Sequence, residues 1–167
     1  MADNDPLTRF PPTFSANTQQ PSRRYVRQPD LIALHVPLTD SQRADVIVEI
    51  ETDAIGIFRQ DAVAVSSRSP DLVITPVYAI DPNGALAVPT GRIFVRFQPE
   101  IRLDELRRAI EDCGFVIVEH LPYAPNAGWL QAAERGIATA LLSFPKLQSI
   151  PQLENAEPQM LMHKAQR

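Results

Sequence analysis

The stretch from Gly91 to Leu161 constrains the fold most strongly, because its hydrophobic period changes in a definite order. It begins with apolar residues at every second position, Ile93, Val95 and Phe97, which alternate with Arg92, Phe94 and Arg96. A period of two is typical of a strand that buries one face. The alternation therefore predicts a strand in a sheet that is covered on one side and free on the other.

The next segment has a helical period. Its apolar residues recur at steps of three and four, at Leu103, Leu106, Ile110 and Cys113, which places them on one face of a helix. Acidic residues lie near its start, and Gly114 stands where a helix commonly ends. We predict a helix that ends at Gly114.

The same logic then repeats. Residues 115–121 predict a strand and residues 122–126 a turn, and the following strand places Trp129 on the core. A second helix is expected from Gly136 to Phe144, ended near Pro145, and a last strand from Leu153 to Met160. The order β-α-β-β-α-β over about 70 residues predicts an α+β fold with a split β-α-β sheet and two helices on one face.

The part of the chain before residue 91 gives weaker patterns. Residues 1–29 show no periodicity and are interpreted as a flexible arm. The cluster Arg23–Arg27 within it could contact a partner, but a solvated linker is favoured. Residues 30–90 predict a smaller β-rich subdomain. Its expected elements are strands at 31–36, 54–58 and 62–67, a helix at 41–51 for which a strand is the alternative, and a hairpin of 72–80 with 85–88 across Asn83-Gly84. Residues 36–53 weakly echo residues 97–114, so a degenerate repeat is one interpretation.

Composition excludes several classes of function. The 167 residues carry a formal net charge of −4, which argues against a basic nucleic-acid or polybasic membrane surface. No apolar run approaches a membrane span, and the N-terminus lacks the order of a secretory signal. We therefore expect a cytoplasmic protein, or an exported one if the chain is a fragment of a longer precursor.

The sequence contains no recognisable catalytic or metal-binding motif. The single cysteine, Cys113, falls on the apolar face of a predicted helix, which favours a buried residue over a nucleophile. His35, His120 and His163 lie far apart, and none has a second ligand at metal-binding spacing. We expect no catalytic residue, no cofactor and no metal, and hence a binding function.

Three motifs in order carry a resemblance to a known family. They are TGRIFVRFQP at residues 90–99, LPYAPNA at 121–127 and PQLENAEPQ at 151–159. Together they resemble the prodomain that precedes subtilisin-like serine proteases, in particular the fervidolysin-like type. The resemblance implies a ferredoxin-like domain over residues 91–161, with residues 30–90 as an accessory β-rich segment and residues 162–167 as a tail. The catalytic domain of such proteases is missing from the chain.

The resemblance also implies a partner and a binding surface. In the family, the open sheet face packs on the protease, and acidic side chains near the last strand cap two protease helices; Glu154 and Glu157 match this role. The segment after the last strand runs through the active-site cleft, and the matching residues are Gln159, Met160, Leu161, Met162, His163 and Lys164. Ordinary exposed carboxylates and a frayed terminus are the alternatives for these two groups.

The expected function is therefore a prodomain-like inhibitor and folding chaperone of a subtilisin-like serine protease. The protease would be bound in trans, or in cis if the chain is a fragment. The alternative is a structural or adaptor domain that binds a non-protease partner through the same face. A small enzyme that uses His120 is a third, minor hypothesis.

Overall fold

A computed structural model describes residues 6–36, 40, 45–50, 55–62, 73–80, 84–134 and 136–162. The strands are β1 Thr13–Ser15, β2 Arg24–Leu34, β3 Val48–Ile50, β4 Ile55–Arg59, β5 Ile74–Ala79, β6 Ala87–Phe97, β7 Phe115–Leu121, β8 Ala124–Ala132 and β9 Leu153–Met162. The helical elements are η1 Pro6–Arg9, η3 Gln60–Ala62, η5 Leu103–Leu106, α2 Arg107–Asp112, α3 Ile137–Ser143 and η6 Phe144–Ser149. Among the described residues, all nine strands belong to a single antiparallel sheet.

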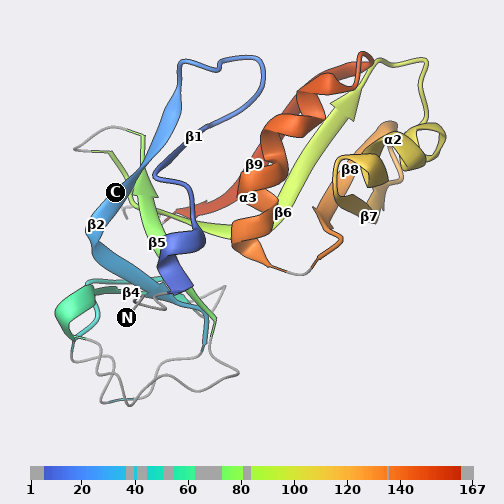
Figure 1. Ribbon diagram of the computed structural model, residues 1–167. Helices are drawn as coiled ribbons and strands as arrows, with labels where there is room; N and C mark the ends of the chain where they lie inside the picture. The colour runs from blue at the N-terminus through green and yellow to red at the C-terminus, as the bar shows by residue number, and fades with distance from the viewer. Residues whose placement is uncertain are drawn as a thin grey trace.

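The long strand β6 is the centre of this sheet (Figure 1). On one edge its first part pairs with β5, at Tyr78 and Ala87, and its second part pairs with β8. On the other edge β9 pairs with it from Ala87 to Phe97. Both halves of the chain therefore share the β6–β9 ladder.

The predicted fold class is wrong. The prediction was a ferredoxin-like split β-α-β sheet with two helices on one face, preceded by a separate and smaller β-rich subdomain. The structure is instead dominated by a large antiparallel sheet, with nine strands in the described residues, that runs through both parts.

The error arose at residues 89–91, which were interpreted as a connection between two strands. In the structure, β6 continues through Pro89, Thr90 and Gly91. The register with β9 shifts between Pro89 and Ile93, and Gly91 adopts φ 88°, a conformation open to glycine at little cost. An irregularity of this kind keeps one strand continuous where the sequence suggests two.

Residues 6–29 form ordered elements rather than the predicted flexible arm. They contain η1, β1 and the beginning of β2, and the side chains of Leu7, Phe10, Phe14 and Tyr25 are buried. The ring of Phe14 contacts that of Tyr78 at 4.8 Å between centroids, and the Tyr78 hydroxyl donates to the Pro11 carbonyl at 2.8 Å. Apolar residues without periodicity can therefore still bury themselves against a sheet formed elsewhere.

Several other predictions in the first half have definite outcomes. The helix expected at 41–51 is wrong at Val48–Ile50, which form β3, in agreement with the β-branched alternative. The strand at 54–58 corresponds to β4, and the expected hairpin is confirmed by the pairing of β5 with β6. The strand at 62–67, apart from Ala62 in η3, and Asn83 of the turn lie outside the described residues.

Predictions for the second half fit the structure more closely. Leu103, Leu106, Ile110 and Cys113 are all buried in one cluster, together with Ile93, Val95 and Phe97 of β6. Gly114 ends the helical segment at φ 91°. The second helix begins as expected, but it continues past Pro145 as η6, and Trp129 does not join the buried cluster.

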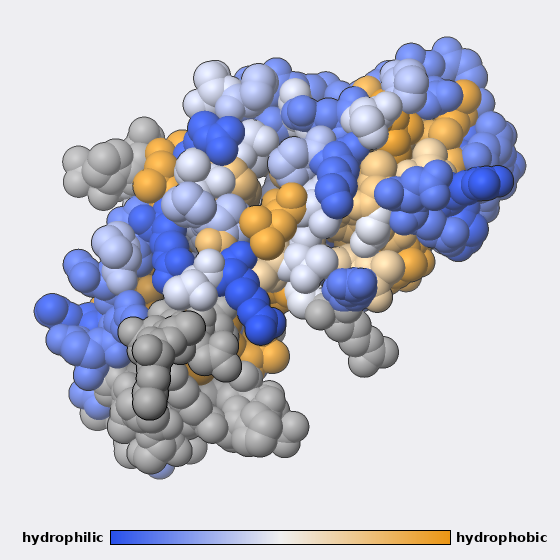
Figure 2. All heavy atoms as spheres, in the orientation of Figure 1, coloured by the Kyte–Doolittle hydropathy of each residue, from blue (hydrophilic) through white to orange (hydrophobic). Residues whose placement is uncertain are grey.

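Figure 2 shows the molecule in the orientation of Figure 1, in which the helical elements of the second half face the reader. Hydrophobic residues reach the surface in small areas between hydrophilic ones. Among the described residues, no helix is long and apolar enough to cross a membrane.

Gly128 in β8 lies at a close approach between the sheet and Leu103 of η5. A Cβ at this position would lie 2.5 Å from the Glu119 carbonyl oxygen and 2.5 Å from the Leu103 Cδ2 atom. The backbone oxygen cannot move without disturbing the pairing of β7 with β8.

We therefore expect Gly128→Ala to lower the free energy of unfolding by about 1 to 3 kcal/mol, the range for overpacking a close-packed core. Urea denaturation monitored by circular dichroism measures the change. Gln131→Ala, at an exposed position of the same strand, is the control and should leave the midpoint nearly unchanged. An unaffected Gly128→Ala variant would contradict this packing.

His35 follows β2 and lies partly buried against β5. Its Nε2 atom forms a hydrogen bond with the Thr75 hydroxyl at 2.9 Å, and its backbone N–H donates to the Val73 carbonyl. Burial lowers the pKa of His35 to about 4, because the charged imidazolium would lose its hydration. This histidine is a partly buried residue packed against β5. The described residues contain no group of side chains suited to a metal ion.

The lowered pKa makes stability depend on pH. The unfolded chain binds a proton at His35 below its ordinary pKa of about 6.5, whereas the folded chain resists protonation until about pH 4. The contribution of His35 to the free energy of unfolding is therefore fully present above pH 6.5. It is lost as the pH falls toward 4, which lowers the free energy of unfolding by roughly 2 to 3 kcal/mol at 1.36 kcal/mol per pKa unit. Urea unfolding at a series of pH values should show this slope, and His35→Gln should flatten it. An equal slope in the variant would assign the effect to other groups.

Candidate functional site

The most distinctive surface of the second half is the sheet face opposite its buried cluster. Strand register places four side chains in one row across this face: Glu119 of β7, Trp129 of β8, Phe94 of β6 and Glu157 of β9. Two aromatic rings thus lie between two carboxylates. We call Arg92, Phe94, Glu119, Trp129 and Glu157 the outer-face cluster.

The cluster is organised by contacts among its own members. The rings of Phe94 and Trp129 meet edge to face, with centroids 5.4 Å apart and planes at 67°. The guanidinium carbon of Arg92 lies 4.9 Å from the Trp129 ring centroid, and the same guanidinium is paired with the Glu119 carboxylate. Edge-to-face rings and a cation over the indole are both favourable arrangements. They hold the aromatic pair in a defined position on the surface.

One polar atom in the cluster has no partner in the structure. The Nε atom of Arg92 is buried beneath its neighbours without a hydrogen bond. A buried donor without a partner is unfavourable for the folded state. The side chain as a whole remains 30% exposed.

The two acidic residues predicted as partner contacts lie on β9, the edge strand next to β6. Glu154 pairs with Arg96 of β6, with 3.2 Å between its Oε2 atom and the arginine Nε atom. Glu157 is exposed and has no ion-pair partner among the described residues. Only Glu157 is thus free to meet a partner without exchanging an existing ion pair.

The structure describes four of the six residues of the predicted cleft segment. Gln159, Met160, Leu161 and Met162 belong to β9 and pair with the beginning of β6. The Gln159 side chain accepts a hydrogen bond from the Thr90 hydroxyl at 2.9 Å, and Met160 and Leu161 pack against buried residues. His163 and Lys164 lie outside the described residues. A segment that enters a cleft would therefore begin after Met162.

The remaining chemical candidates have structural partners. The Nε2 atom of His120 lies 2.8 Å from the Asp104 carboxylate, and this hydrogen bond lowers the pKa of Asp104. The neighbouring Arg107 lowers this pKa further. The Cys113 thiol is buried and donates to the Lys146 carbonyl at 3.4 Å. Ser149 donates to the same carbonyl oxygen. Among the described residues, these groups form no nucleophile–base pair.

Sequence reasoning missed the centre of the site. Trp129 was expected in the core, but its pairing with Phe94 places it on the outer face. A register shift in β7 between Ile117 and Glu119 brings Glu119 into the same row. The alternation in β6 had already assigned Arg92 and Phe94 to this face and was the one available signal.

Comparison with known proteins gives no relative for this chain. No protein-family model, no curated protein and no solved structure matches it.

Burial predicts that the Cys113 thiol is unreactive in the folded protein. We expect a disulfide reagent such as Ellman's reagent to label one thiol in urea and almost none under native conditions, because the side chain is only 6% exposed. Fast native labelling would contradict the buried position. Leu142→Cys, at a position of α3 that is 55% exposed, is the positive control.

Proposed function

We propose that this protein is a prodomain-like inhibitor and folding chaperone of a subtilisin-like serine protease. The outer face of β6, β7, β8 and β9 would dock on the protease, and the segment after Met162 would enter the active-site cleft. The partner is bound in trans, or in cis if the chain is part of a longer precursor. The motifs at residues 90–99, 121–127 and 151–159 motivate this choice of partner.

The observation that carries the proposal is the row Glu119–Trp129–Phe94–Glu157. Partly exposed aromatic residues held in a fixed geometry, with charged residues around them, have the composition of an interface centre and its rim. Glu157 adds a carboxylate beside the aromatic pair, and a helix N-terminus of a partner is a favourable environment for such a charge.

Because of the position of β9, we assign binding and inhibition to different parts of the chain. Because β9 is held along β6 up to Met162, the outer face keeps its shape without the residues that follow. Docking and cleft occupancy are therefore assigned to different parts of the chain, the face to affinity and the residues after Met162 to inhibition.

Two variants of the full chain test this assignment with subtilisin as the probe. Phe94→Ser combined with Trp129→Ser should weaken binding at least about tenfold, since central aromatic residues dominate interface energies. Removal of residues 163–167 should preserve binding to active-site-blocked subtilisin but reduce inhibition of peptide hydrolysis by the active enzyme.

Leu142→Ser is the matched control, because this leucine is 55% exposed but lies on α3, away from the outer face. Its binding should equal that of the unmodified protein, and circular dichroism should show all variants folded. Failure of the unmodified chain to bind subtilisin or other subtilisin-like proteases would overturn the proposal and favour the adaptor alternative. Equal loss in the Leu142→Ser variant would remove the outer face from the interface.

A further inference from the structure

The edge of β9 that faces away from β6 is closed at one end and open at the other. At the closed end, the Ala156 N–H donates to the Thr18 hydroxyl at 2.9 Å, and the Ala156 carbonyl accepts from the Thr18 N–H at 3.0 Å. Pro158 follows and has no N–H to offer. Beyond it, residues 159–162 form no backbone hydrogen bond on this edge with any other described residue.

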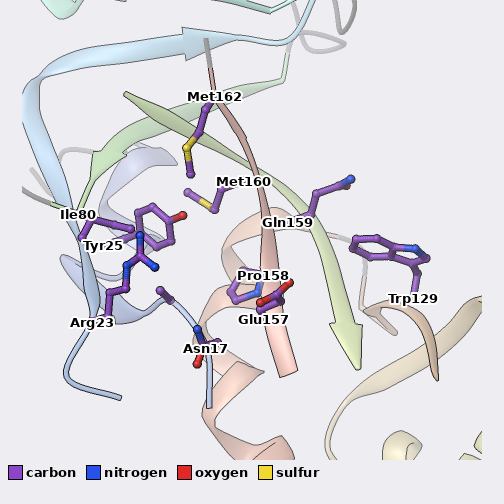
Figure 3. A pocket seen from close by; sticks show the side chains of 11 residues that line it. Asn17, Arg23, Tyr25, Ile80, Trp129, Glu157, Pro158, Gln159, Met160 and Met162 are labelled. Carbon is purple, nitrogen blue, oxygen red and sulfur yellow. The ribbon is translucent and has the colours of Figure 1, made fainter. Parts of the chain in front are cut away.

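A groove runs along this free edge. It has a volume of about 350 Å³ and lies between β9 and the segment from Ala16 to Tyr25, which comprises the β1–β2 connection and the start of β2. Ile80 and Trp129 line it as well. Figure 3 shows Met160 and Met162 of β9 pointing across the groove toward Tyr25 and Ile80. An unpaired strand edge beside apolar side chains is the arrangement to which an extended peptide adds as a further strand.

The closed end of the groove carries two charges of opposite sign. Arg23 comes from the β1–β2 connection and Glu157 from β9, and both are exposed. Neither has an ion-pair partner among the described residues, and both lie close enough to affect the pKa of the Tyr25 hydroxyl, which burial raises. A ligand here gains from carrying both an acidic and a basic group near this end, and apolar groups toward Met162.

We propose that an extended segment of a partner protein binds in this groove, pairing its backbone with residues 159–162 of β9. The segment carries one acidic and one basic residue at the end near Arg23 and Glu157, followed by β-branched apolar residues over the two methionines. A peptide is favoured over a compact small molecule, because the groove offers a strand edge rather than an enclosed cavity with buried polar groups. The groove shares Glu157 and Trp129 with the outer-face cluster, but the backbone edge of residues 159–162 that pairs with the segment is not part of that cluster.

Three synthetic peptides test the proposal with the full chain. The charged probe is acetyl-Glu-Lys-Val-Thr-Val-amide, the neutral probe replaces Glu and Lys by Gln, and the third is the charged probe with N-methylated valines and threonine. In NMR titrations, the charged and neutral probes should shift the amide signals of residues 159–162. The N-methylated probe lacks the backbone N–H groups of its valines and threonine, so it cannot form the backbone pairing with β9 and should cause no shifts.

A charge comparison then separates specific binding from general stickiness. The charged probe should bind about threefold more tightly than the neutral one, the effect expected of exposed ion pairs. In the Arg23→Gln, Glu157→Gln double variant, the two probes should bind equally. The amide signals of residues away from the groove show whether the double variant is folded. If it is not folded, Arg23→Gln alone replaces it in the comparison.

The site is refuted if the probes shift no amide of residues 159–162, if the N-methylated probe binds as well as the charged one, or if the charge preference survives in the double variant. These outcomes do not depend on protease inhibition, so failure of the groove and failure of the proposed function are distinguishable.

Discussion

The pairing of β6 with β9 is the interaction on which the rest of the structure depends. It extends from Ala87 to Phe97 and is the one ladder common to both halves of the chain. At one end Ala87 also pairs with Tyr78 of β5, and at the other Ile93, Val95 and Phe97 enter the cluster with η5, α2 and α3. Because strands on both edges complete its hydrogen bonds, β6 fixes the register of every neighbour.

The ladder also explains which features could be predicted from the sequence. The period of three and four at Leu103, Leu106, Ile110 and Cys113 identified a buried helical face, because local spacing alone decides which residues share a side. Trp129 was misplaced, since its face depends on the register between β8 and β6, which no local pattern encodes. The continuity of β6 through Pro89 was missed because proline and glycine ordinarily end a strand, whereas here β9 pairs with both Pro89 and Ile93.

The candidate site shows the same division. Arg92 and Phe94 could be assigned to the outer face from alternation within one strand, whereas Glu119 reached the cluster through a register shift between two strands. The ion pair of Glu119 with Arg92 and the stacking of Arg92 on Trp129 are tertiary contacts between three strands. Interfaces built across strands are thus harder to find in a sequence than those built along one element.

The position of β9 has a consequence for how the chain folds during synthesis. The central strand β6 leaves the ribosome long before β9, the strand that covers its second edge. Thr18, which bonds to Ala156 on the outer edge of β9, is made earlier still. Until β9 emerges, β6 exposes an unpaired edge flanked by the apolar residues of both halves, the state most prone to incorrect association. The described sheet therefore depends on a late, non-local contact, since the edge of β6 stays unpaired until β9 has been made.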